Sequence, residues 1–275
     1  MADEEYLLGV NDTELDRLRF QHSVWGPVTR DFLERLGVKP GWNCLDAGSG
    51  PGFVTVDLRE LVGPTGEVTA LEISPFYVEQ ARKEAAAKGY KDIRFLQGKV
   101  EDIALPPDHF DLVFSRWVLS FAPDSEQFLL PLMRSLRPGG ILAVQDYYYE
   151  GLSLWPTGGA FDKMADVVRK YYIEARGDPY VTGKLPELFR KHGLGLVEFS
   201  PHILAGGPES PIMEWAHRFF TTHTGAMVEK GAADQQTADA MVADWHAHRA
   251  NPDALFFSPV VVDVAGRKPF DADHK

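Results

Sequence analysis

The sequence predicts an α/β fold in which helices cover both faces of one parallel sheet. Three observations support this prediction. An apolar strand, a three-glycine turn and the start of a helix follow one another over residues 43–62. Strand-like and helix-like apolar stretches then alternate as far as Gln145, which is the pattern of a parallel sheet with helical crossovers. The composition, with 44% hydrophobic and 25% charged residues, is that of an ordinary globular protein.

The first 40 residues are expected to form a helical cap, and residues 41–275 the main domain. Asn11-Asp12-Thr13 can cap a helix, and apolar side chains recur after it at helical spacing. Gly26-Pro27 is expected to interrupt this helix, after which the apolar face resumes at Val28. The cap either lies across the site that the glycine turn forms or packs on the sheet.

The glycine turn Gly48-Ser49-Gly50-Pro51-Gly52 follows a buried strand that ends at Asp46-Ala47. Alternate glycines can adopt positive φ and let the backbone run close to a ligand. The helix that begins at Gly52 and ends near Val62 has an apolar side that suits packing on a sheet. A strand, a glycine turn and a helix N-terminus together predict a nucleotide-binding element.

The rest of the chain continues the pattern and then loosens. Strands are expected at residues 68–72, 93–96, 110–114 and 141–145, and helices at 74–88 and 128–136. After Asp146 the expected elements are helices near 161–175 and 184–192, a strand at 196–200 and a last strand at 256–265. Residues 205–258 are interpreted as a largely helical insertion before that last strand.

Charge and composition limit the classes of function. The formal net charge of −12 argues against nonspecific nucleic-acid binding, because phosphate backbones attract basic surfaces. No stretch approaches 18 uninterrupted apolar residues, so no membrane span is expected. The acidic first residues lack the apolar core of a secretory signal, and a cytoplasmic protein is expected. The single cysteine, Cys44, rules out an intramolecular disulfide.

Two classes of nucleotide cofactor compete for the glycine turn. A dinucleotide site would carry a third glycine where Phe53 stands. Glu72, at the end of the second strand, could accept hydrogen bonds from ribose hydroxyls of either cofactor. Asp46 distinguishes them, because a carboxylate beside the turn repels a pyrophosphate but suits a ligand that carries an ammonium and a sulfonium. The sequence therefore favours a sulfonium cofactor over a dinucleotide.

Five stretches in order resemble the motifs of the class I S-adenosylmethionine-dependent methyltransferases, over roughly residues 41–147. They are Leu45-Asp46-Ala47-Gly48-Ser49-Gly50-Pro51-Gly52, Val68-Thr69-Ala70-Leu71-Glu72-Ile73-Ser74, Gly98-Lys99-Val100-Glu101-Asp102, Phe110-Asp111-Leu112-Val113-Phe114-Ser115 and Leu136-Arg137-Pro138-Gly139-Gly140-Ile141-Leu142. The ubiquinone/menaquinone-biosynthesis-like small-molecule enzymes are the subgroup that the chain resembles most. The resemblance implies a Rossmann-like, doubly wound sheet of seven strands, mostly parallel, with the last strand antiparallel.

The resemblance also implies S-adenosylmethionine as cofactor, S-adenosylhomocysteine as product, and a set of binding residues. Glycines at the turn would admit the methionine part, Glu72 would bind the ribose, and the backbone of Val100 would read the adenine edge. Many relatives carry an aspartate where this chain has Lys99, so Glu101, Asp102 or the backbone alone must hold the adenine amino group. The implied cofactor residues are Tyr6, Gln21, Asp46, Gly48, Ser49, Gly50, Gly52, Glu72, Ile73, Val100, Glu101 and Ser115.

The acceptor pocket is expected outside the carboxyl ends of the strands. Many of its candidate residues are aromatic, which suggests a flat or apolar small molecule: His22, Trp25, Arg116, Trp117, Tyr149 and Phe220. Methyl transfer is an in-line displacement that depends mainly on positioning, and a general base is needed only if the acceptor must lose a proton. Asp146, Tyr147 and His217 are the candidates for polarising an acceptor. No pair of histidines has a metal-binding spacing, so no metal is expected.

Two alternatives remain open to test. A non-catalytic protein could keep the fold to bind S-adenosylmethionine or a partner, with residues 205–258 as an oligomer or partner surface. A dehydrogenase is disfavoured by Phe53 and Asp46. The sequence leaves open the oligomeric state, the acceptor, and which of O, N, C or S is methylated.

Overall fold

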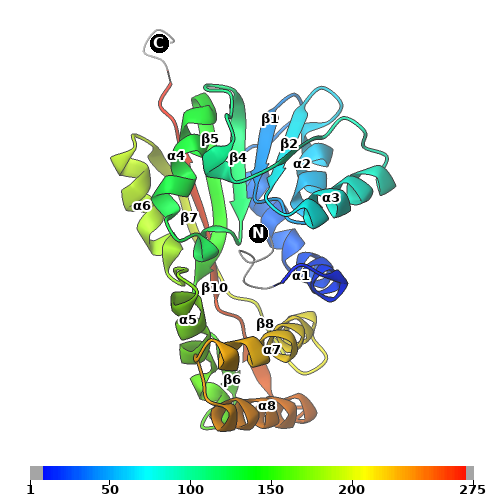
Figure 1. Cartoon of the computed structure of the whole chain (residues 1–275), viewed down its shortest axis with the longest axis vertical. Helices are drawn as coiled ribbons and strands as arrows, with labels where there is room; N and C mark the ends of the chain where they lie inside the picture. The colour runs from blue at the N-terminus through cyan, green and yellow to red at the C-terminus, as the bar shows by residue number, and fades with distance from the viewer. Residues whose placement is uncertain (1–8, 271–275) are drawn as a thin grey trace.

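The computed structural model describes residues 9–270 and contains one central sheet with helices on both faces (Figure 1). The seven strands run in the order β3-β2-β1-β4-β5-β10-β7. All neighbours pair in parallel except β10, which is antiparallel to both β5 and β7. This confirms the predicted sheet. Its strands are β1 (Asn43–Ala47), β2 (Glu67–Glu72), β3 (Arg94–Gln97), β4 (Phe110–Arg116), β5 (Leu136–Tyr148), β7 (Gly195–His202) and β10 (Val260–Arg267).

Alternate residues of the strands separate two apolar cores, because successive strand side chains point to opposite faces. Cys44 and Leu112 face one core with three helices, α1 (Asp12–Arg35), α2 (Phe53–Val62) and α3 (Pro75–Ala87). Leu45 and Val113 face the other core with α4 (Ser125–Ser135) and α6 (Val181–Lys191). The sheet is thus covered on both faces, as the alternating pattern predicts.

The first helix, α1, is continuous, so the predicted break at Gly26-Pro27 is wrong. Proline removes one backbone donor from a helix and crowds the preceding turn. Buried side chains on both sides of Pro27, Trp25 before it and Phe32 after it, pack inward and hold the two halves in line. The Thr29 hydroxyl oxygen also lies 3.2 Å from the carbonyl oxygen of Trp25, across the proline.

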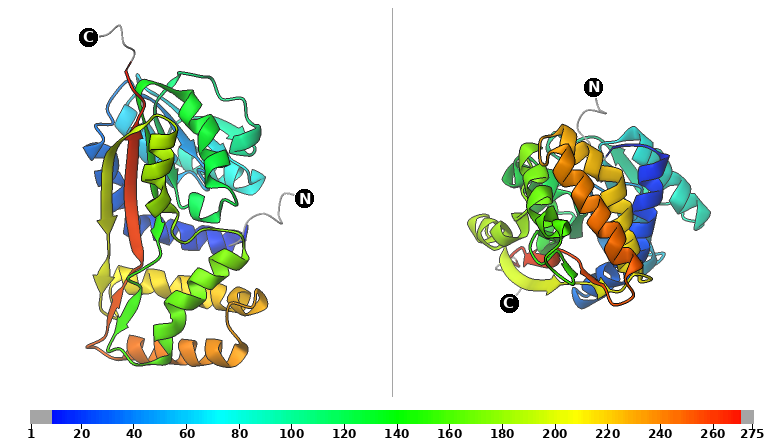
Figure 2. Two further views of the ribbon diagram at one scale, coloured as in Figure 1. Left: turned by 90° about the vertical axis from the view of Figure 1, so that its left-hand side faces the viewer. Right: turned by 90° about the horizontal axis from the view of Figure 1, so that it is seen from below.

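A smaller layer lies beyond the carboxyl ends of the central strands (Figures 1 and 2). It contains a three-stranded antiparallel sheet in the order β6-β9-β8, which the sequence did not predict. Its strands are short: β6 (Ser153–Trp155), β8 (Ala205–Gly206) and β9 (Leu255–Phe257). The predicted insertion is helical in its middle, with α7 (Pro211–Glu229) and α8 (Gln235–Ala250), while both of its ends are strands.

The last predicted strand, residues 256–265, divides into β9 and β10. Ser258-Pro259 separates them, and proline cannot donate a hydrogen bond to a sheet ladder. A third apolar core joins the two layers; it contains Trp25 of α1, Tyr147 of β5, Tyr172 of α5 (Met164–Glu174) and Phe219 of α7. Within residues 9–270, every helix is too short or too polar to serve as a membrane span.

Candidate functional site

A cavity of about 850 Å³ lies where the central strands end and α1 crosses them. Two groups of side chains line it. The glycine-turn wall consists of Asp46, Gly48, Ser49, Gly50, Glu72, Ile73, Val100 and Glu101. The aromatic wall consists of Trp117, Phe121, Tyr147, Tyr172 and Phe219. Helix α1 contributes Glu14, Arg17, Leu18 and Gln21.

The glycine turn is fixed to the end of β2. Gly48 and Ser49 both donate backbone hydrogen bonds to the carbonyl of Leu71, at 2.8 and 3.0 Å. Gly52, with φ of 81°, precedes the first residue of α2, and a Cβ there would lie 2.7 Å from the Cβ of Ala81. Glycine is therefore required both by the backbone conformation and by the close approach of α3. The turn is thus packed closely between the end of β2 and α3.

Glu72 also contacts this turn. Its buried carboxylate accepts hydrogen bonds from the backbone of Gly50 (2.8 Å) and of Ser74 (2.9 Å). Burial raises the pKa of Glu72, and these backbone donors oppose that rise. A carboxylate has about four acceptor positions, so two bonds leave capacity for hydroxyl groups of a ligand in the cavity.

Asp46 lies beside the turn and is almost fully buried. Burial raises its pKa to about 6. Two neighbours oppose this rise: the Thr55 hydroxyl, which donates to the carboxylate at 2.6 Å, and the Arg116 guanidinium. Near neutral pH the ionised form predominates, so this end of the cavity offers a negative charge to a cationic ligand.

The other predicted cofactor residues divide between the cavity and its surroundings. Gln21, Ile73, Val100 and Glu101 line the cavity, as do Lys99 and Asp102 beside them. Ser115 lies behind the wall, where its hydroxyl donates to the carbonyl of Ala47 (2.9 Å) and ties β4 to β1. Gly52 also lies behind the wall, against α3. Tyr6 is outside the described residues.

The aromatic wall is built around Trp117, the residue after β4. Its φ of 53° is rare for a residue with a side chain, and strained backbone of this kind concentrates at functional sites. The indole stacks on Tyr147 with ring centres 5.9 Å apart, and Tyr147 in turn contacts Tyr172 edge-on. The Trp117 indole nitrogen is buried without a hydrogen-bond partner among residues 9–270. The wall therefore combines flat apolar surfaces with one unsatisfied donor.

Of the six predicted acceptor residues, only Arg116 and Trp117 line the cavity. The others are packing residues in this structure. Trp25 meets Trp117 and Trp215 edge-on in the third core, and Tyr149 and Phe220 are buried in the same core. His22 stacks on Phe53 and interacts with Arg116 at 3.2 Å, and burial lowers its pKa to about 3.

The three predicted polarising residues are also separated. Tyr147 lines the cavity, and burial raises the pKa of its hydroxyl above the ordinary value. Asp146 is buried outside the cavity lining, where its carboxylate accepts from the backbone of Ser120 (3.2 Å) and of Tyr147 (2.8 Å). His217 accepts from the indole of Trp245 (3.2 Å) and does not line the cavity. Neither Asp146, four residues beyond the fifth motif, nor His217, on a distant helix, carried a sequence signal for the direction of its side chain.

The sequence did not predict several of the lining residues, among them Glu14, Arg17, Tyr172 and Phe219. Glu14 and Arg17 could have been recognised from the sequence. They are opposite charges three residues apart on a predicted helix, so their side chains lie on the same face and can pair. Tyr172 and Phe219 carried no such signal. They come from α5 and α7, and only the tertiary fold brings those helices to the cavity.

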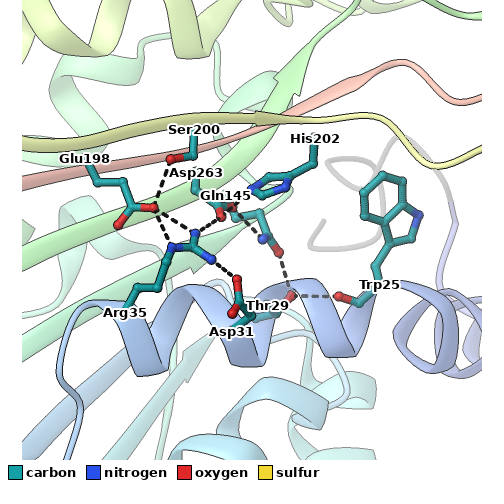
Figure 3. A network of polar contacts seen from close by, with 9 residues as sticks. All are labelled: Trp25, Thr29, Asp31, Arg35, Gln145, Glu198, Ser200, His202 and Asp263. Atoms are coloured by element: carbon teal, nitrogen blue, oxygen red, sulfur yellow. Dashed lines mark hydrogen bonds and ion pairs between the residues drawn. The ribbon is translucent and has the colours of Figure 1, made fainter.

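A buried polar network connects α1 with the sheet (Figure 3), and Arg116 joins this network at Thr29. The Nη1 of Arg116 donates to the Thr29 hydroxyl (2.8 Å), which donates to Gln145 Oε1 (2.5 Å). Gln145 Nε2 then donates to Asp263 on β10 (2.7 Å), and Arg35 donates to the same carboxylate (2.8 Å). The network fastens α1 to the sheet and fixes the guanidinium at the cavity.

Within the part of the chain that the structure describes, no three His, Cys, Asp or Glu side chains are grouped to hold a metal ion.

Comparison with known proteins identifies the family. Residues 38–175 match the family model described as a methyltransferase domain. The demethylmenaquinone methyltransferase of Lactococcus lactis is 30% identical over 196 residues, which are 66% of this chain and 76% of that enzyme. The ubiquinone/menaquinone biosynthesis C-methyltransferase UbiE of Ectopseudomonas mendocina is 33% identical over 131 residues, 47% of this chain and 50% of that enzyme.

A solved structure agrees in fold. Phosphoethanolamine N-methyltransferase 2 of Haemonchus contortus, in complex with S-adenosyl-L-methionine, superposes with a TM-score of 0.53 at 18% identity, over 87% of this chain and 51% of that one. The chain thus spans about half the length of the UbiE relative and three quarters of the Lactococcus enzyme. Together with the sheet order and the glycine turn, these matches show that the chain belongs to the S-adenosylmethionine-dependent methyltransferase family.

Proposed function

We propose that this protein transfers the methyl group of S-adenosylmethionine to a small molecule with a flat or apolar body. One observation carries the proposal: a single cavity joins the glycine-turn wall to the aromatic wall. A cofactor held at the first wall would direct its methyl group into space bounded by the second. Residues 1–40 would act as a cap, since α1 contributes four side chains to the same cavity.

The cofactor side follows from charge and shape. Glu72 would accept hydrogen bonds from the ribose hydroxyls, and Asp46 would face the ammonium of the methionine part. Gly48 and Gly50 would admit that part because they present no Cβ. Ile73 and the backbone of Val100 would contact the adenine, and Glu101 or Asp102 its amino group. Gln21, on α1, would close over the ligand.

The acceptor side is where Trp117, Tyr147 and Tyr172 present ring faces and edges. Aromatic pairs favour offset or edge-to-face contacts, so these side chains would favour a flat ring in the cavity. The names of the two relatives, a demethylmenaquinone methyltransferase and a ubiquinone/menaquinone biosynthesis C-methyltransferase, support a quinone-type ring methylated at carbon. Alignment of acceptor, methyl and sulfur would supply most of the rate, since good positioning contributes on the order of 7–11 kcal/mol.

The test has two steps. Isothermal titration with S-adenosylhomocysteine should show binding; absence of binding at high micromolar concentration would contradict the proposal. Labelled S-adenosylmethionine is then incubated with hydroxylated naphthalenes, quinols and a metabolite extract. Label in an extractable small molecule is the expected result. Cofactor binding with no labelled product would instead favour a non-catalytic binding protein.

A further inference from the structure

A buried ion pair on α1 faces the cavity and has no part in holding the glycine turn. Arg17 donates from Nε and Nη2 to the two carboxylate oxygens of Glu14, both at 2.7 Å, and from Nη1 to Gln21 (3.0 Å). Both charged side chains are nearly inaccessible, at 1% exposure for Glu14 and 4% for Arg17, yet both line the cavity. A buried pair of this kind stabilises a fold no better than apolar residues of the same size. Its place in the cavity therefore suggests a chemical use.

The pair lies at the aromatic end of the cavity. The Arg17 guanidinium lies 5.9 Å from the ring centre of Phe219 and acts electrostatically on Tyr147 and Tyr172. Among the residues that the structure describes, three of its five N–H groups have partners, so each terminal nitrogen keeps one for a ligand. An anionic oxygen in the cavity would find two donors here.

The groups that face Glu14 come from several elements. Arg17 is on its own helix, and His223 of α7 lies 3.7 Å from its carboxylate. Tyr77 of α3 and Tyr171 of α5 are within electrostatic reach. Burial raises the pKa of Glu14 against the opposing effect of Arg17, and burial lowers the pKa of His223 to about 3, so that the imidazole is neutral. Arg17 is therefore the one full positive charge among these neighbours.

Building on the proposed function, we propose that Glu14 is the general base of the reaction and that the acceptor is an aromatic compound with an acidic hydroxyl group. The hydroxyl proton passes to a Glu14 carboxylate oxygen. The electron pair left on the acceptor, at oxygen or at the ring carbon conjugated with it, forms the new bond to the methyl carbon. After attack from carbon, the C–H bond of that carbon breaks and its proton passes to the acceptor oxygen, which restores the aromatic ring. The carbon–sulfur bond breaks, and its electron pair stays on sulfur as the neutral thioether. The Arg17 guanidinium then pairs with the acceptor oxyanion in place of the Glu14 carboxylate. The net charge of the pocket therefore does not change during the proton transfer.

Other polar groups at the cavity fit this role less well. Asp46 and Glu72 belong to the glycine-turn wall and are engaged by Thr55 and by backbone donors. Asp124 caps α4 through the backbone of Gln127. The Tyr147 hydroxyl is protonated near neutral pH, and burial raises its pKa further above the ordinary value. Glu14 is the lining carboxylate whose bonded partner, Arg17, also reaches the aromatic wall.

The experiment compares Glu14→Gln with Glu34→Gln, the same substitution at an exposed position of the same helix. Both variants and the unmodified protein are titrated with S-adenosylhomocysteine and then assayed with a hydroxylated acceptor over a range of pH. Binding is expected to stay within about threefold in both variants. The kcat of Glu14→Gln is expected to fall on the order of 100-fold near neutral pH and to rise with pH as the acceptor ionises in solution. Glu34→Gln should behave like the unmodified protein.

The main readout of a second measurement comes from the unmodified protein, so it does not depend on how well Glu14→Gln folds. In the unmodified protein with S-adenosylhomocysteine bound, 4-nitrophenol should take on the absorbance of its phenolate at a pH below its solution pKa, and Arg17→Met should abolish this shift. If the unmodified protein did not bind S-adenosylhomocysteine, the proposed function itself would be refuted. Normal turnover in Glu14→Gln with an unchanged pH profile, or 4-nitrophenol bound in its neutral form, would overturn the role of Glu14 alone.

Discussion

The two walls of the cavity are built in different ways. The glycine-turn wall comes mostly from β1, β2 and the turns that follow them, and backbone hydrogen bonds to Leu71 and Glu72 hold it in shape. The aromatic wall brings together side chains from β5, α5 and α7 with Trp117, and it is held by ring contacts. A wall built from local backbone suits a ligand that does not vary, such as the proposed cofactor. A wall built from side chains of distant segments can differ from one protein to another, as the acceptor does.

The largest effect is expected from Glu72→Ala, which tests whether the glycine-turn wall is the cofactor wall. The substitution removes the acceptor for two backbone donors and for the ribose hydroxyls. Each hydrogen bond to a charged group is worth about 1.5–3 kcal/mol, so the Kd for S-adenosylhomocysteine should rise on the order of 100-fold by isothermal titration. Glu67→Ala, at the exposed start of the same strand, should leave it unchanged. An unchanged Kd in both variants would show that this wall does not bind the cofactor.

The next prediction compares two causes of lost stability at the turn, backbone strain and close packing. Gly52 and Gly89 share a φ of 81°, but a Cβ at Gly52 would lie 2.7 Å from Ala81 whereas Gly89 has open space. Both alanine variants should lose about 1–2 kcal/mol from the left-handed backbone, and Gly52→Ala about 1–3 kcal/mol more from overpacking. Urea unfolding measures the difference. Equal losses would mean that the α2–α3 contact does not depend on this glycine.

The contrast between the walls also explains what the sequence could predict. The Gly48–Gly52 turn and Glu72 are close in sequence to the strands that position them, so spacing alone predicted both. The parallel sheet followed from alternating strands and helices, and the antiparallel last strand from the resemblance to the methyltransferase family. The aromatic wall depends on where α5 and α7 pack, and the missed residues Tyr172 and Phe219 carry no local signal. Trp25 and Phe220 were predicted at the site for their aromatic character, yet the same character serves them in the core.

A pH titration examines the charge at the glycine-turn wall. Burial raises the pKa of Asp46 to about 6, so its ionised form is lost as the pH falls through that value. Affinity for S-adenosylhomocysteine should fall up to about tenfold between pH 7 and 5, and Asp46→Asn should weaken binding and flatten this dependence. The contribution of Asp46 to the stability of the unliganded protein changes with pH in the opposite direction. The unliganded fold gains stability from about pH 6 down to 3.8, because only the folded state then holds the proton. A pH-independent Kd in the unmodified protein would contradict a role for Asp46.

The smallest effect probes the aromatic wall. Trp117→Leu removes one ring face, and aromatic contacts of this kind are worth about 0.5–1.5 kcal/mol. The acceptor KM should rise about fivefold while the Kd for S-adenosylhomocysteine stays nearly constant. Trp155→Leu, at an exposed tryptophan of β6, is the control. If Trp117→Leu instead weakened the binding of S-adenosylhomocysteine and left the acceptor KM unchanged, the aromatic wall would not be the acceptor wall.

The most direct measurement is a crystal structure of the protein with S-adenosylhomocysteine bound. In this complex the ribose hydroxyls are expected to bind Glu72, the ammonium to face Asp46, and the sulfur to point toward Trp117 and Tyr147. A ligand bound outside this cavity, or one with its sulfur directed away from the aromatic wall, would contradict the assignment of the two walls.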